Sequence, residues 1–144
     1  MVYVDSSVFV ALIVNEQGSA AAGGWYDANG TQMVSAAWCI TEVASALGQK
    51  QRMGLLDAGL AENAWARFES MAASEVQLIP VEFTDFHASV DLMQDGVSGL
   101  RAGDALHLAC ARRLKAETIA TLDRVMAHGA ERFGMQIVPG LLEA

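Results

Sequence analysis

The sequence predicts an α/β protein with a central parallel sheet and helices on both of its faces. Short runs rich in β-branched residues alternate with longer runs of helical periodicity along all 144 residues. This alternation is typical of parallel strands joined by helical crossovers. No repeat, low-complexity segment or linker divides the chain, so we expect a single domain over residues 1–144.

In the first half of the chain, residue type and spacing define each expected element. We expect strands over residues 2–5 and 32–35 and helices over residues 8–14, 19–27, 36–53 and 56–73. Ser6 or Ser7 can cap the first helix and Ser35 the third, since a serine hydroxyl accepts a bond from a free helix amide. Gly54 is a suitable stop for the third helix. Apolar residues at helical spacing predict the buried faces of the last two helices: Ala36, Ile40, Val43 and Leu47, then Leu56, Leu60, Ala64, Phe68 and Met71.

The second half of the chain continues the alternation. We expect strands over residues 76–81, 118–122 and 135–138, a loop over residues 95–99, and helices over residues 85–94, 104–115 and 124–132. Thr84 or Asp85 can cap the first of these helices. That helix carries the apolar residues Phe86, Val90 and Met93 at helical spacing, which predicts that they face the core.

The composition indicates a globular protein and limits its partners. Hydrophobic residues make up 53% and charged residues 18% of the chain, and the net charge is −8. A protein that binds nucleic acid broadly would be basic, whereas an acidic protein suits a basic protein partner. Cys39 and Cys110 fall in apolar helical patterns and are expected to be buried thiols. The apolar run over residues 8–14 is too short to span a membrane, and we expect a cytoplasmic protein.

Four carboxylates stand beside the expected strands and helices: Asp5, Glu42, Asp104 and Asp123. Asp5 and Asp123 each follow an apolar strand, while Glu42 and Asp104 lie in the first turns of helices. Carboxylates next to buried strands are unfavourable unless they are paired or bind a metal. In an open parallel sheet the carboxyl ends of the strands form the ligand crevice. Four acids meeting there predict a site for a hard divalent cation.

Each candidate residue also has a simpler interpretation. Asp104 alone could serve the helix dipole, Asp5 and Asp123 could be turn residues, and Glu42 could lie on a solvated helix face. His107, three residues after Asp104, is either a packed core residue or a ligand or general base. Three tryptophans could stack on RNA bases, but their helical settings favour packing in the core: Trp25, Trp38 and Trp65.

The order of these motifs resembles one family along essentially the whole chain. The four segments that carry the acids are residues 2–7, 40–47, 100–109 and 121–124. They resemble the corresponding segments of PIN-domain ribonucleases, and specifically of VapC-type toxins of type II toxin–antitoxin pairs. The resemblance implies a three-layer α/β/α sandwich, PIN-like, with a central parallel sheet. It also implies Mg²⁺- or Mn²⁺-dependent cleavage of RNA, an antitoxin with a basic tail that occludes the acidic cleft, and a homodimer.

The resemblance extends to the roles of individual residues. Asp5 and Asp104 are expected to bind the ion directly or through water, and Glu42 to bind it through water or to orient the attacking water. Asp123 is expected to bind a second ion or to support the first. Hydroxyl groups of Ser6 and Thr121 could hold the acids in place, as groups around a metal site do. Arg101 could contact a phosphate or pair with a carboxylate.

Two other functions are weighed against the nuclease. A haloacid-dehalogenase-type phosphatase also begins with an aspartate after its first strand, but needs a second aspartate two residues later, where this chain has Ser7. The alternative from another class is a non-catalytic PIN-like module that binds RNA or a basic protein partner. No phosphate-binding loop of the Walker or GxGxxG type is present in the sequence.

Overall fold

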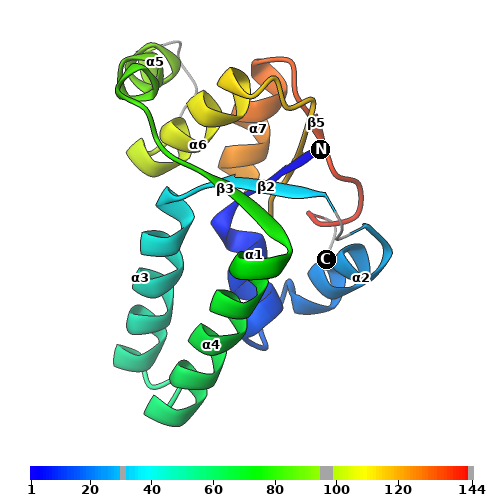
Figure 1. The fold of residues 1–144 in the computed structure, drawn as a ribbon, viewed down its shortest axis with the longest axis vertical. Helices are drawn as coiled ribbons and strands as arrows, with labels where there is room; N and C mark the ends of the chain where they lie inside the picture. Colours follow the sequence, from blue (N-terminus) through cyan, green and yellow to red (C-terminus); the bar gives the residue numbers. More distant parts are fainter. Residues whose placement is uncertain (30–31, 95–98, 143–144) are drawn as a thin grey trace.

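A computed structural model describes residues 1–29, 32–94 and 99–142 and has the three-layer α/β/α architecture that the sequence predicted (Figure 1). Five parallel strands form the middle layer in the order β3-β2-β1-β4-β5. Their bounds are β1 Val2–Val4, β2 Met33–Ala36, β3 Val76–Ile79, β4 Thr118–Ala120 and β5 Gln136–Ile137. The predicted parallel sheet is therefore confirmed.

Helices cover both faces of the sheet (Figure 1). One layer contains α1 (Ser6–Ile13), α2 (Ser19–Asn29), α3 (Trp38–Arg52) and α4 (Ala58–Ser74). The other contains α6 (Ala102–Arg113) and α7 (Arg124–Arg132), with α5 (Phe83–Gln94) packed on α6. Within the described residues, none of these helices combines the length and the apolar character needed to cross a membrane.

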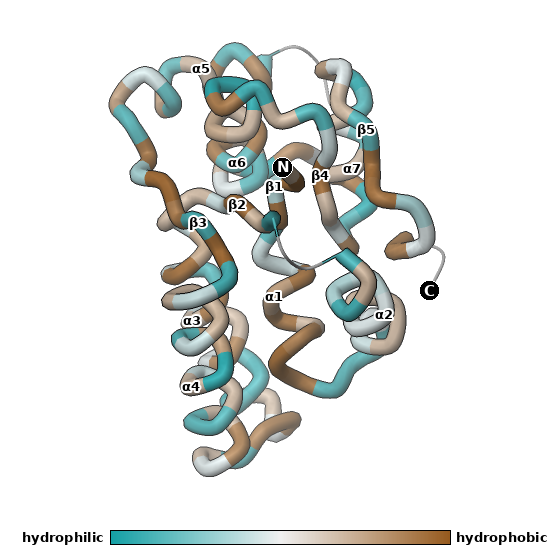
Figure 2. Tube along the Cα trace, turned by 45° about the vertical axis from the view of Figure 1, so that its right-hand side comes forward, coloured by the Kyte–Doolittle hydropathy of each residue, from teal (hydrophilic) through white to brown (hydrophobic). Residues whose placement is uncertain are grey.

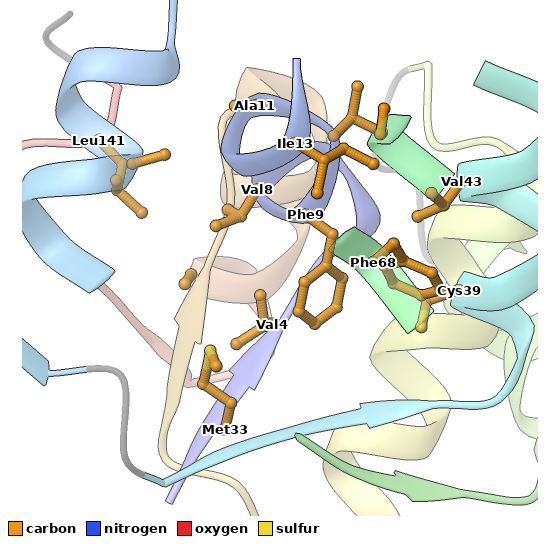
Figure 3. Close-up of a cluster of buried hydrophobic side chains, with 14 of the residues drawn as sticks. Val4, Val8, Phe9, Ala11, Ile13, Met33, Cys39, Val43, Phe68 and Leu141 are labelled. Atoms are coloured by element: carbon orange, nitrogen blue, oxygen red, sulfur yellow. The ribbon is translucent and has the colours of Figure 1, made fainter. Parts of the chain in front are cut away.

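Two hydrophobic cores lie on the two faces of the sheet because successive strand residues point in opposite directions. Val4 contributes to the core beneath α1 to α4, whereas its neighbour Tyr3 faces α6 and α7. Figure 3 shows the first core, in which the rings of Phe9 and Phe68 meet edge to face with centroids 5.7 Å apart. Helix α1 is hydrophobic along most of its length (Figure 2) and five of its eight residues are buried, which confirms the expected core helix.

The order of the strands creates a crevice beside β1. From β1 the chain moves outward through β2 to β3, then returns to the other side of β1 to form β4 and β5. Such a change of direction opens a crevice at the carboxyl ends of the two strands that flank it. Val4 pairs with Ala120 in the register of β1 and β4, so Asp5 and Thr121 emerge next to each other at that crevice.

Among the described residues, five helices start two residues away from the predicted position: α1, α3, α4, α5 and α6. Helix α1 begins at Ser6, with Asp5 as its N-cap residue. Ser35 does not cap α3, because it lies inside β2 and its hydroxyl donates to the Val4 carbonyl oxygen at 2.8 Å. Helix α6 starts at Ala102, which places Asp104 inside its first turn. The predicted stop of α3 is confirmed, since Gly54 follows that helix with φ +76°.

The predicted buried face of α5 is wrong. Phe86, Val90 and Met93 are 50%, 44% and 36% exposed, and the helix instead buries three residues on another face: Asp85, Ser89 and Leu92. This buried face carries the ion pair between Asp85 and Arg113 of α6, a contact that the spacing of apolar residues does not reveal. Ile40 and Leu60 are also exposed, contrary to prediction. The predicted loop falls mostly on residues 95–98, which lie outside the described residues.

Candidate active site

Residues from four separate segments line one cleft of about 360 Å³ at the carboxyl ends of β1 and β4. The residues that come together there include all four acids and their neighbours: Asp5, Ser6, Ser7, Glu42, Arg101, Asp104 and Asp123. The cleft continues along α3, where Lys50 forms a 2.6 Å ion pair with Glu16. The fold thus gathers into one cleft the four carboxylates that the sequence selected.

Asp5 is held by two hydroxyl groups. It is 3% exposed, and its Oδ2 accepts bonds from Ser7 Oγ at 2.7 Å and from Thr121 Oγ1 at 2.9 Å. Ser7 also accepts a bond from the Leu122 amide at 3.0 Å, which ties α1 to the end of β4. The expected contact from Thr121 is present. The serine that reaches Asp5 is Ser7, while Ser6, expected in this role, lines the cleft.

Asp104 is buried, and its charge is only partly compensated. It is 7% exposed, and within the described residues its Oδ2 is a buried atom with no hydrogen-bond partner. The nearest cation is Arg101, whose Nε lies 3.6 Å from this oxygen. Burial, followed by the negative charges of Asp5 and Asp123, raises the pKa of Asp104 to about 6, against the opposing effect of Arg101. The acids are therefore close enough to repel one another.

Asp123 has two roles that divide between its oxygens. Oδ1 accepts bonds from the amides of Val125 at 2.8 Å and Met126 at 3.1 Å, so it caps helix α7. Oδ2 faces the cleft and accepts a 3.2 Å bond from Arg101 Nη2. Asp123 is thus the N-cap of a helix, where the simpler interpretation was a turn residue, and its second oxygen pairs with Arg101 in the cleft.

Glu42 is fixed at the edge of the cleft by α6. Its Oε1 is hydrogen-bonded to His107 Nε2. Its Oε2 faces Gly103, where an added methyl group would lie 3.0 Å from that oxygen and 3.1 Å from Trp38 Nε1. Glycine at this position therefore allows Glu42 to lie against α6. Neither Gly103 nor this contact was selected from the sequence, where the only signal is a glycine directly before Asp104.

His107 is neither a ligand nor a base in this arrangement. The residue is fully buried, and both ring nitrogens are engaged, Nδ1 with Tyr3 Oη at 2.6 Å and Nε2 with Glu42. Burial lowers the pKa of His107, but its hydrogen bond to Glu42 and the nearby negative charges outweigh this effect and raise the pKa overall. The sequence favoured a packed histidine, and it gave no signal of the two hydrogen bonds.

Arg101 pairs with carboxylates, one of the two roles considered. Its guanidinium bridges Asp104 and Asp123 while 76% of its side chain stays exposed. In the part of the chain that the structure describes, no three His, Cys, Asp or Glu side chains stand close enough together to hold a metal ion without adjustment. Still, the donor set fits a hard divalent cation, because it supplies several carboxylate oxygens and one of them, Asp104 Oδ2, is buried and accepts no hydrogen bond within the described residues.

The remaining candidates serve the fold. Trp25 and Trp65 pack against the first core and Trp38 against the second, as the helical pattern favoured. Cys39 and Cys110 are buried free thiols, as expected.

Comparison with known proteins identifies the family and the fold. The model of the PIN domain family matches residues 2–131. The fold is similar to the crystal structure of VapC20 from Mycobacterium tuberculosis, a toxin that cleaves the sarcin–ricin loop. The TM-score is 0.74 at 14% sequence identity, over 89% of this chain and 94% of that one. No curated protein matches the sequence.

Proposed function

The chain belongs to the PIN domain family, and on that premise we propose that it is a metal-dependent endoribonuclease, the toxin of a VapC-type toxin–antitoxin pair. One observation carries the proposal: Asp5, Glu42, Asp104 and Asp123 come from four distant segments and line a single cleft. The resemblance of the fold to a VapC toxin supports the same function.

The proposed cofactor is Mg²⁺ or Mn²⁺. When bound, such an ion polarises a phosphodiester and lowers the pKa of an attacking water. Asp5 and Asp104 are the proposed ligands, directly or through water. Glu42 is proposed to bind through water or to orient the nucleophile, and Asp123 Oδ2 to serve a second ion or to support the first.

Other residues of the cleft hold these carboxylates in place or pair with them. Ser7 and Thr121 hold Asp5 Oδ2, so that its other oxygen is directed by the fold instead of by solvent. Arg101 is proposed to turn from the carboxylates to a phosphate of the RNA, because its exposed guanidinium can reorient and matches phosphate geometry. Arg101→Gln is then expected to raise KM for RNA more than it lowers kcat.

The proposed protein partner is an antitoxin with a basic tail, and the proposed location of both proteins is the cytoplasm. The net charge of −8 and the acidic cleft support this choice, because a basic segment would neutralise both. A gene directly beside this one should encode a small protein with an arginine-containing tail. The measurement is whether that purified small protein inhibits RNA cleavage by this chain.

We also propose a homodimer. The apolar side chains that α5 leaves exposed support self-association, since such surface is typical of protein contacts: Phe83, Phe86, Val90 and Met93. Sedimentation of the purified chain at several concentrations tests the proposal, and a monomer at all of them would reject it.

The test of the enzyme is incubation of the purified protein with total RNA, with Mn²⁺ or with EDTA. Metal-dependent cleavage by the wild type, abolished in Asp5→Asn, supports the nuclease. Asp91→Asn, an exposed acid on α5, is the matched control and should cleave like the wild type. RNA binding without cleavage would instead identify a non-catalytic module.

A further inference from the structure

A buried histidine connects the centre of the sheet to one acid of the cleft. His107 lies on α6, three residues after Asp104, and is 0% exposed. Its Nδ1 is 2.6 Å from Tyr3 Oη of β1, and its Nε2 is bonded to Glu42 Oε1 of α3. One imidazole ring thus joins a strand, the helix that carries it and the helix that carries Glu42.

The positions of the protons along this chain follow from Tyr3. The Ala36 amide donates to Tyr3 Oη at 3.2 Å, so the hydroxyl oxygen already accepts one bond. The Tyr3 hydroxyl carries a proton that it can donate to His107 Nδ1 across the 2.6 Å contact. A neutral ring that accepts at Nδ1 has its proton on Nε2, and a protonated ring has one on both nitrogens, so Nε2 carries a proton in either case. From there the ring donates to Glu42.

We propose that His107, oriented by Tyr3, is a positioning residue that fixes Glu42 Oε1 for its work at the cation. The inference rests on the proposed nuclease function, since Glu42 has no task in the cleft without an ion. His107 does not touch substrate, because it is fully buried and both ring nitrogens are bonded.

Glu42 needs an anchor more than Asp5 and Asp123 do. Asp5 is held by two hydroxyls and Asp123 by two helix amides, on short side chains. Glu42 has a longer side chain that is 24% exposed. The hydrogen bond from His107 fixes one of the Glu42 oxygens before the ion binds. Ion binding then loses less free energy to the conformational entropy of this side chain. Partners of this kind, outside the ligand set, typically change metal affinity by about 10–100-fold.

The experiment measures Mn²⁺ affinity without RNA, from the electron paramagnetic resonance signal of the free ion. We expect His107→Leu to weaken binding by about 10–100-fold. His107→Gln should stay within a few-fold of the wild type, because its amide nitrogen can still donate to Glu42. Tyr3→Phe should fall between these two, since it leaves the ring without its orienting donor.

Controls and a second readout separate positioning from general damage. His128→Gln and Tyr26→Phe alter residues that do not line the cleft and should leave Mn²⁺ affinity unchanged, since His128 is exposed and the Tyr26 hydroxyl bonds Glu75. With RNA at saturating Mn²⁺, His107→Leu should lower kcat while leaving KM for RNA near its wild-type value.

The outcomes are distinguishable. Folded His107→Leu with wild-type Mn²⁺ affinity would overturn the positioning role. If that variant does not fold, Tyr3→Phe decides, and wild-type affinity in Tyr3→Phe would overturn it equally. A wild type that neither binds Mn²⁺ nor cleaves RNA, or a Glu42→Gln variant that binds and cleaves normally, would instead reject the site behind the proposed function.

Discussion

Two buried aspartates lie at the two ends of α6: Asp104 is in its first turn, and Asp85 of α5 pairs with Arg113 in its last turn. Asp104 in the cleft is 7% exposed and Asp85 of α5 is 2% exposed. Asp104 has a raised pKa of about 6, whereas the pKa of Asp85 is lowered. Burial raises both values, so the difference comes from the neighbours of each carboxyl group.

The neighbours of Asp85 satisfy its charge completely. Arg113 donates to Asp85 Oδ1 from Nε and to Oδ2 from Nη2, both at 2.9 Å, and the Glu82 amide donates to Oδ2 at 2.8 Å. Asp104 has only Arg101 at 3.6 Å, and other acids surround it. A carboxylate that is paired and hydrogen-bonded stabilises the fold. A buried carboxylate without such partners would instead be stabilised by a bound cation. The comparison therefore separates an acid that is fully hydrogen-bonded within the fold from one whose charge is only partly compensated.

The largest expected effect is the loss of cleavage in Asp104→Asn. Removing a charged ligand should reduce metal-dependent RNA cleavage by about 1,000-fold, equivalent to about 4 kcal/mol. The folded state should be no less stable, because the substitution removes a buried charge that is only partly compensated. RNase assays with Mn²⁺ and urea unfolding check the two parts. Near-normal cleavage with a marked loss of stability would reverse the assignment of the two aspartates.

Asp85→Asn should show the opposite behaviour. Breaking the pair leaves Arg113 without its partner and is expected to destabilise the fold by about 3 kcal/mol, or about 10 °C in Tm. The fraction that stays folded should bind Mn²⁺ with wild-type affinity, since Asp85 does not line the cleft. Thermal unfolding and Mn²⁺ titration at 15 °C measure both. An unchanged Tm would mean that the ion pair contributes nothing.

The pH dependence of the free energy of unfolding should also distinguish Asp104 from Asp85. The raised pKa of Asp104 means that the native state takes up a proton near pH 6 and the unfolded chain only near pH 4. Between these values the native state binds more protons, so the contribution of Asp104 stabilises the fold by up to about 3 kcal/mol as the pH falls. The contribution of Asp85 has the opposite sign, is present above about pH 4 and is lost as the pH falls through its lowered pKa.

The measurement is urea unfolding in EDTA from pH 7 to pH 3, for the wild type and both asparagine variants. Subtracting the Asp104→Asn curve from that of the wild type should give a difference that changes between pH 6 and pH 4. A flat difference would show that Asp104 titrates normally.

The smallest expected effect is that of Gly103→Ala. The new methyl group would lie 3.0 Å from Glu42 Oε2 and should displace that carboxylate by a few tenths of an ångström. We expect Mn²⁺ affinity to fall about threefold, equivalent to about 0.6 kcal/mol, while alanine in a helix adds up to about 1 kcal/mol of stability. Gly48→Ala on α3 is the matched control, and equal affinities in the two variants would contradict the close contact.

The local pattern of the sequence identified most of the fold. Alternating strand and helix runs were enough for the parallel sheet, because that pattern depends on neighbouring residues. The buried faces of α3, α4 and α5 were harder, since they depend on partners that are distant in the sequence. Phe86 and Val90 face solvent, whereas the Asp85–Arg113 pair lies on the buried face of α5, and Arg113 lies 28 residues away from Asp85.

For the site, the sequence by itself determined which acids to examine, because an aspartate after a strand or at a helix start is visible in the local pattern. Only the tertiary structure decided what holds each of them. Ser7 and not Ser6 reaches Asp5, and His107 links Tyr3 to Glu42 across 104 and 65 residues of chain. The physical reason is that a hydrogen bond depends on the distance between donor and acceptor to within a few tenths of an ångström, and on the direction of the donor group. Only the packing of β1, α3 and α6 fixes these quantities.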